Sequence, residues 1–241
     1  MSLSRPIGLF DSGIGGFSIL KEAQKLLPHE NFLYYADEAH YPYGEKSRAE
    51  IEEYSRKAAE FLLEREAKIL VIACHTASAC ALDFLQHHCQ VPVIGMIEPS
   101  LELAQQADLK NLTLLGSRAL IHSQLYQSHL ARKLPEVTLR AVDGQELVSV
   151  AQEKRSDGKE VAQKLLLGDS SSALFLACTH FSCLKPLLQE VVGEKVLLLD
   201  PAEKMAKCLV STLEKNGLLN PQEERGTCRF YSSATSIYSI T

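Results

Sequence analysis

Two stretches of the chain share one pattern, in which an apolar run leads into alanine and then into a cysteine beside threonine and histidine. The first covers residues 69–78 and contains Cys74, and the second covers residues 174–181 and contains Cys178. A short apolar run closed by small polar residues is typical of a buried parallel strand. Because ligands bind at the carboxyl ends of strands in open α/β sheets, the pattern predicts a thiol at that edge in each half of the chain.

Strands and helices are expected to alternate along the whole chain, which predicts an α/β fold with mainly parallel sheets. The alternation of predicted strands and helices starts again at Glu98. We therefore expect two pseudo-symmetric lobes, each a mainly parallel sheet flanked by helices, with the active site in the cleft between them. Residues 1–97 would form the first lobe and residues 98–204 the second. Residues 205–241 are expected to pack back on the first lobe, and the tail from Cys228 is left without an assigned structure. The expected strands cover residues 7–10, 31–36, 69–73, 92–95, 112–115, 137–142, 174–177 and 196–199.

Composition narrows the class of protein. The formal net charge of −5, without a basic run, makes nucleic acid a poor partner. We find neither the apolar region of a signal peptide nor a membrane span. Seven cysteines, an odd number, in a chain without an export signal indicate reduced thiols. We therefore expect a cytoplasmic protein that binds neither nucleic acid nor membrane.

Two thiols that face the same ligand could act as acid and base on opposite faces of a single carbon atom. One thiolate would remove a proton and the opposite thiol would return one, which is general acid–base catalysis. A thiol at a helix N-terminus is expected to have a lowered pKa, and His75 and His180 are the nearest bases that could support the two sulfurs. Two alternatives stay open: both cysteines are inert core residues, or Cys74, Cys178 and His180 hold a catalytic zinc ion.

The first predicted strand ends in a glycine-rich turn that runs from Asp11 to Gly16. Backbone N–H groups of such a turn can hold an anion. The turn lacks the lysine of a P-loop and does not match a dinucleotide-binding fingerprint. Asp11 would repel a phosphate, so it is expected to attract an ammonium group or to orient a base.

Taken together, the motifs resemble those of the glutamate racemases, and the resemblance runs from Ile7 to about Ala202. The matching segments, in chain order, are residues 11–16, Pro42-Tyr43-Gly44, residues 73–78, residues 92–95 with Ile97-Glu98-Pro99, and Cys178-Thr179-His180. The resemblance implies an amino-acid racemase that needs no metal or other cofactor. It also implies a cytoplasmic supply of D-glutamate for peptidoglycan, and a homodimer.

Roles for individual residues follow from the resemblance. Cys74 corresponds to the base that acts on D-glutamate and Cys178 to the base that acts on the L-isomer, with Asp11 and His180 as their supporting groups. Glu146 stands where we expect an acid near His180. The implied substrate contacts are Asp11, Ser12, Tyr43, Gly44, His75, Thr76, Glu146, Thr179 and His180.

The chain also departs from the family pattern around the binding site. The family usually has a substrate-binding asparagine where His75 stands. The other departures are Leu120, Gly144-Gln145 and Ser182-Cys183. Three alternatives to a glutamate racemase therefore remain. The chain is a racemase of aspartate or another acidic amino acid, a paralogue that binds its ligand without turnover, or a metal-dependent hydrolase.

Overall fold

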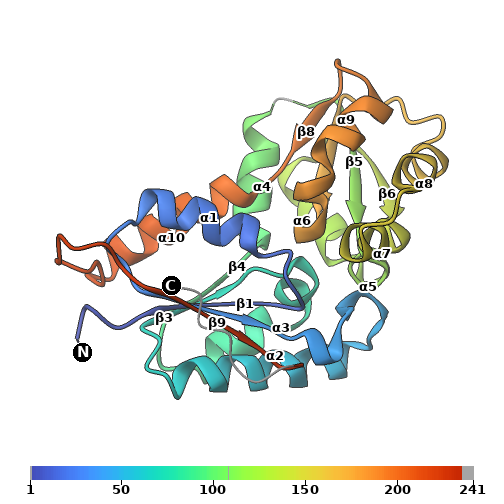
Figure 1. Ribbon diagram of the computed structural model, residues 1–241. Coiled ribbons are helices and arrows are strands. Elements are labelled where there is room, and N and C mark those ends of the chain that lie inside the picture. The colour runs from blue at the N-terminus through green and yellow to red at the C-terminus, as the bar shows by residue number, and fades with distance from the viewer. Residues whose placement is uncertain (1, 108, 235–241) are drawn as a thin grey trace.

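The computed structural model describes residues 2–107 and 109–234 and contains two β-sheets flanked by helices (Figure 1). Every strand pairing in these described ranges is parallel. The sheets have five and four strands. The expectation of an α/β fold with two parallel sheets is therefore confirmed.

The first sheet has the strand order β4-β3-β1-β2-β9. Helices α1 and α10 cover one face, and α2 and α3 cover the other (Figure 1). The two end strands are short or partly exposed, whereas β1 and β3 are buried along their whole length, as their apolar runs predict. Its elements are β1 (Ile7–Asp11), α1 (Phe17–Leu26), β2 (Phe32–Ala36), α2 (Arg48–Leu63), β3 (Ile69–Ile72), α3 (His75–His88), β4 (Val93–Gly95), α10 (Ala202–Lys215) and β9 (Cys228–Ser232), with 3-10 turns η1 (Glu38–His40) and η2 (Tyr43–Glu45) after β2.

The second sheet has the strand order β6-β5-β7-β8. Helices α4 and α6 pack on one face through an apolar cluster, and α7, α8 and α9 pack on the other. Its elements are α4 (Ile97–Gln106), β5 (Asn111–Gly116), α5 (Arg118–Ser123), α6 (Leu125–Lys133), β6 (Thr138–Asp143), α7 (Gln145–Glu153), α8 (Gly158–Leu165), β7 (Ala173–Ala177), the 3-10 turn η3 (Thr179–Leu184), α9 (Lys185–Val192) and β8 (Leu197–Leu199).

Local sequence signals explain where several helices begin and end. Ser47 and Glu50 form a capping box at the start of α2. Residues 118–133 form two helices rather than one, because Gln124 adopts a left-handed backbone conformation with φ of 55° and separates α5 from α6. A non-glycine residue with positive φ interrupts helical hydrogen bonding.

The segment after α10 adds the edge strand β9 to the first sheet. Cys228 pairs with Phe32, and Ser232 pairs with Ala36 of β2. Phe230 packs edge-on against Phe17 at 5.0 Å between ring centroids, and Arg65 lies over the ring of Tyr231. The tail that the sequence left unassigned is therefore structural as far as residue 234.

The carboxyl ends of the two sheets face each other, and contacts between them join the lobes. Asp11 at the end of β1 bonds to Thr179 after β7, and Thr76 after β3 bonds to Ser117 after β5. Strand direction thus brings the polar residues of both halves to one place.

Within the described ranges, no helix combines the length and the apolar character that crossing a bilayer requires.

Candidate functional site

A narrow cavity lies between the facing ends of the two sheets, and both cysteines of the repeated pattern line it. It leaves about 10 Å³ of room for water-sized molecules. The lining includes every expected site residue except Asp11, which lies behind Thr179, and Glu146. Residues that were not among the expected site residues also line it: Tyr41, Pro42, Ser117, Gln145 and Val148.

Cys74 is the N-cap residue of α3, directly after β3. Its sulfur accepts a hydrogen bond from the Ala77 amide at 3.4 Å and donates to the Ser12 hydroxyl at 3.7 Å. Burial, together with the Asp11 carboxylate, raises the pKa of the Cys74 thiol to about 12, against the lowering effect of the Ala77 amide. The expectation that the helix N-terminus would leave this thiol with a lowered pKa is therefore wrong, because burial outweighs the effect of the helix.

Asp11 is fully buried at the end of β1 and spans the two lobes. Its carboxylate accepts hydrogen bonds from the Gly13 amide at 3.1 Å and from the Thr179 hydroxyl at 3.2 Å. Burial raises the pKa of Asp11 to about 7, although these donors oppose the shift. The charge of this group therefore changes near neutral pH.

Cys178 and His180 form a second pair at the end of β7. The Cys178 sulfur lies 3.9 Å from Nδ1 of His180, and Nε2 of the same ring lies 2.9 Å from Oε1 of Gln152. Burial raises the pKa of the Cys178 thiol, and the Cys74 and Asp11 charges raise it too. Burial lowers the pKa of His180 to about 4, so the ring is neutral at pH 7.

His75 lines the cavity but is oriented by a residue of the other lobe. Its Nδ1 lies 2.8 Å from the hydroxyl of Tyr126 on α6, and that hydroxyl lies 3.5 Å from Ser100 of α4. Burial lowers the pKa of His75 to about 3. The ring is therefore neutral and does not titrate near pH 7.

Tyr43 and Gly44 reach the cavity because a buried carboxylate holds their loop. The Tyr43 hydroxyl donates to Asp37 at 2.6 Å. Gly44 lies so close to the second lobe that a Cβ there would overlap the side-chain oxygen of Gln145 and lie 2.8 Å from the Ser117 Cβ. The absence of a side chain at Gly44 therefore lets the two lobes meet.

The structure does not place Glu146 near His180. Its carboxylate is exposed and lies 3.8 Å from Arg155, and the residue that contacts the histidine is Gln152. Gln145, Val148 and Gln152 are spaced three and seven residues apart, so they share one face of α7 that turns toward the site. Glu146 lies one residue, or about 100°, away from that face. The sequence analysis missed Gln152, and its helical spacing from Gln145 is the signal that could have found it.

No three His, Cys, Asp or Glu side chains in the described ranges group as ligands of a metal ion.

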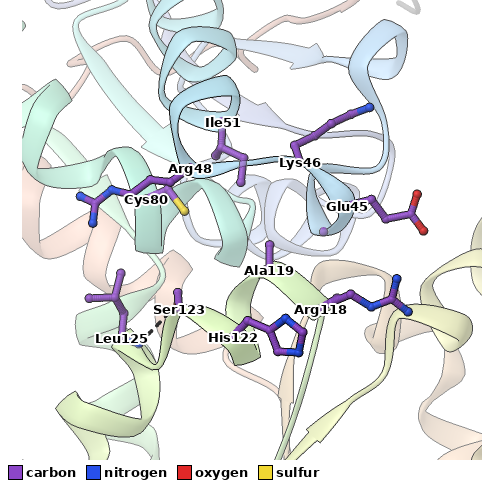
Figure 2. A pocket seen from close by; sticks show the side chains of 11 residues that line it. Glu45, Lys46, Arg48, Ile51, Cys80, Arg118, Ala119, His122, Ser123 and Leu125 are labelled. Carbon is purple, nitrogen blue, oxygen red and sulfur yellow. Dashed lines mark hydrogen bonds between the residues drawn. The ribbon is translucent and has the colours of Figure 1, made fainter.

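A larger hollow of about 700 Å³ lies beside the cavity and shares only Gly44 with it. Figure 2 shows that Lys46 and Arg48 line this hollow from the first lobe, and that Arg118 and His122 line it from α5. Arg48 bonds to Glu52 and Arg118 bonds to Asp143, so local carboxylates balance much of this positive charge. The chemistry therefore belongs to the narrow cavity, where both thiols converge.

Comparison with known proteins agrees with the fold and the motifs. A family model described as Asp/Glu/Hydantoin racemase matches residues 18–209. A glutamate racemase of Geobacter metallireducens is 37% identical over 236 residues, which are 95% of this chain and 87% of that protein. The crystal structure of a glutamate racemase isoform from Bacillus anthracis has a TM-score of 0.89 at 28% identity, covering 95% of this chain and 89% of the other. A Francisella tularensis glutamate racemase in complex with D-glutamate has a TM-score of 0.88 at 34% identity, covering 96% and 89%.

Proposed function

Because the chain belongs to the Asp/Glu/hydantoin racemase family, we propose that it is a glutamate racemase, a cofactor-independent isomerase that interconverts L- and D-glutamate. The observation that carries the proposal is the convergence of Cys74 and Cys178 on one enclosed cavity from the ends of two different sheets. Such a cavity offers an acid and a base to the two faces of one carbon atom.

In the proposed reaction, one thiolate removes the α-proton of glutamate and the opposite thiol supplies a proton from the other side. Cys74 acts on D-glutamate, supported by Asp11, and Cys178 acts on L-glutamate, supported by His180. Burial raises the pKa of both thiols, which keeps them protonated at neutral pH. A substrate ammonium group brought into this dry cavity would favour the thiolate, since opposite charges attract strongly where water is excluded.

Neutral donors are expected to bind the two carboxylates of the substrate. The described residues that line the cavity include no lysine or arginine, and the rings of His75 and His180 are neutral. Hydroxyls of Ser12, Thr76 and Thr179 lie there together with the N-terminal turn of α3, whose free N–H groups attract anions. The cavity is smaller than a glutamate molecule, so the lobes must separate to admit it.

The decisive experiment is incubation of the purified protein with L-glutamate, and separately with D-glutamate, in heavy water. Circular dichroism should decay to zero from either enantiomer, and NMR should show deuterium entering Cα. L-Aspartate is run in parallel. Faster racemisation of aspartate would reassign the substrate, and binding of glutamate without loss of optical activity would make the protein a binding protein.

Replacement of either thiol tests the two-base mechanism directly. Cys74→Ala and Cys178→Ala should each abolish racemisation, because each removes the acid or base on one face, while circular dichroism shows an unchanged fold. Cys208→Ala, a partly buried cysteine of α10 away from the cavity, is the matched control and should keep wild-type turnover. Near wild-type rates in either cavity variant would exclude the mechanism.

Further properties are proposed from the family alone. The D-glutamate would supply peptidoglycan synthesis in the cytoplasm, and the protein would act as a homodimer. Growth of a D-glutamate auxotroph that carries this chain tests the first proposal. Sedimentation equilibrium at micromolar concentration tests the second, and a monomer mass would contradict it.

A further inference from the structure

The His180 ring contacts a different group through each of its two nitrogens. Nε2 lies 2.9 Å from Oε1 of Gln152, and Nδ1 lies 3.9 Å from the Cys178 sulfur, near the outer limit for a hydrogen bond to sulfur. Gln152 comes from the inward face of α7, whereas His180 and Cys178 come from the end of β7. Two elements of the second lobe therefore hold this ring.

Burial leaves the ring with one proton at neutral pH, because it lowers the pKa of His180 to about 4. A neutral imidazole donates from one nitrogen and accepts at the other. The side-chain oxygen of Gln152 only accepts, so the proton lies on Nε2 and the lone pair of Nδ1 faces Cys178. The buried thiol, whose pKa is raised, is then the donor to that lone pair.

Other titratable groups surround His180 without bonding to its ring nitrogens in the described part of the chain. The Tyr41 ring lies 5.5 Å away between centroids, and the Cys183 thiol donates to the His180 carbonyl. Asp11 reaches the histidine's neighbour Thr179. On its outer side, His180 borders a hollow of about 460 Å³ that is also lined by Lys21, Glu22, Lys185 and Asp200. Two of these side chains are positive and two are negative, so their charges largely cancel and the direct partners of the ring dominate its protonation.

We propose that Gln152 is a positioning residue whose neutral amide holds His180 with its proton on Nε2, so that Nδ1 accepts a hydrogen bond from Cys178 and the pair stays uncharged in the resting enzyme. The inference deepens the proposed function, since it assumes that Cys178 is one of the two acid–base groups. A carboxylate at position 152 would act differently. It would stabilise an imidazolium ring, and a positive ring would favour the Cys178 thiolate.

Two variants separate orientation from charge. Gln152→Leu keeps a similar volume but removes the acceptor, so kcat should fall by about tenfold to a hundredfold with a smaller change in KM, in line with loss of a positioned acid–base group. Gln152→Glu restores an acceptor at the same place. It should recover much of the kcat lost in Gln152→Leu, and it should change the pH profile of kcat/KM, because the carboxylate raises the pKa of His180. Glu153→Gln alters an exposed charge one residue further along α7 and should behave as wild type.

The second readout is the rate at which iodoacetamide alkylates Cys178, followed by peptide mass spectrometry, with the exposed Cys183 as internal reference. Gln152→Glu should raise Cys178 alkylation at pH 7 by about tenfold, since only the thiolate reacts. An unchanged alkylation rate in Gln152→Glu, or wild-type kcat and pH profile in Gln152→Leu, would overturn the inference. Because alkylation needs no turnover, it tests Gln152 even if glutamate proves not to be the substrate.

Discussion

Asp11 is the charged residue with the widest influence on the site. It is fully buried, it bonds across the lobes to Thr179, and its charge raises the pKa of both Cys74 and Cys178. Its own pKa of about 7 means that a shift of less than one pH unit changes the electrostatics of the whole cavity. An ionised Asp11 would attract the ammonium group of an amino acid into a site without other fixed charge.

Asp11→Asn should therefore change activity and pH dependence together. In the wild type, kcat/KM, which reports groups of the free enzyme, should rise with pH through about 7 as Asp11 ionises. The variant should lose this rise and be slower by about a hundredfold to ten-thousandfold. A pH–rate profile from pH 5 to 9 measures both. Persistence of the rise in Asp11→Asn would assign it to another group.

The same residue predicts the pH dependence of stability. The folded-state pKa is raised from 3.8 to about 7, so the folded protein binds more protons than the unfolded chain between these values. Stability from this group is present in full below pH 4 and falls as pH rises through 7, by on the order of 4 kcal/mol. Urea unfolding at pH 5 and pH 8 should show a smaller decrease in Asp11→Asn than in the wild type.

His75 illustrates a second role for a residue in the cavity wall. Its ring stays neutral, and its bond to Tyr126 joins the first lobe to the second. His75→Asn should preserve or raise kcat/KM for glutamate, because the amide can still donate and accept while opening the cavity. It should also lower the free energy of unfolding by about 1–3 kcal/mol, because the buried Tyr126 hydroxyl loses its shorter hydrogen bond.

Ser100→Ala is the control for this variant, since it removes only the weaker 3.5 Å contact of the same hydroxyl. Steady-state kinetics on both enantiomers and on aspartate, with urea unfolding, measure the two effects. A large loss of glutamate activity in His75→Asn would show that the histidine itself supports catalysis or selects the substrate.

At the scale of elements, the loop that carries η2 forms one wall of the cavity by direct contact with α5 and α7. Gly44→Ala should keep each lobe folded but prevent the lobes from closing, because the new Cβ overlaps Gln145 and crowds Ser117. The expected result is a lower kcat and a higher KM for glutamate, with an unchanged circular dichroism spectrum. Adding Gln145→Ala to this variant should recover part of the loss, because it removes the nearest overlapping atoms. Failure of Gln145→Ala to recover any activity would show that Gly44 acts through its backbone conformation.

Apolar runs and turn residues in the sequence predicted most elements near the site, because buried parallel strands such as β3 and β7 are short, apolar and bounded by polar residues. Two features escaped prediction. β9 lies at a sheet edge with most of its side chains partly exposed, and it pairs with a strand almost two hundred residues earlier, so neither composition nor local pattern marks it. The resemblance placed Glu146 near His180, whereas Gln152 contacts the ring, because sequence order fixes a residue's neighbours but not the angle at which a helix meets its sheet.

At the scale of the whole molecule, the first lobe is assembled from both ends of the described chain. Phe230 of β9 packs against Phe17 at 5.0 Å and lies 5.9 Å from Tyr34. Phe230→Ala should lower the free energy of unfolding by about 1–3 kcal/mol, less than a fully buried aromatic residue would. Arg229→Ala, the exposed neighbour on the opposite face of the strand, should change it by no more than about 0.5 kcal/mol. If Phe230→Ala and Arg229→Ala changed the free energy of unfolding equally, β9 would stabilise the first lobe through its backbone alone.

The placement of β9 beside β2 also has a consequence for biosynthesis. The strands of the second sheet lie in one uninterrupted stretch of the chain, between residues 111 and 199, and can pair soon after they leave the ribosome. The first sheet begins earlier but receives its last strand only after all of these residues have been made. Throughout that interval the edge of β2 is open to pairing with other nascent chains, so translation that stalls before Cys228 should yield aggregation-prone fragments.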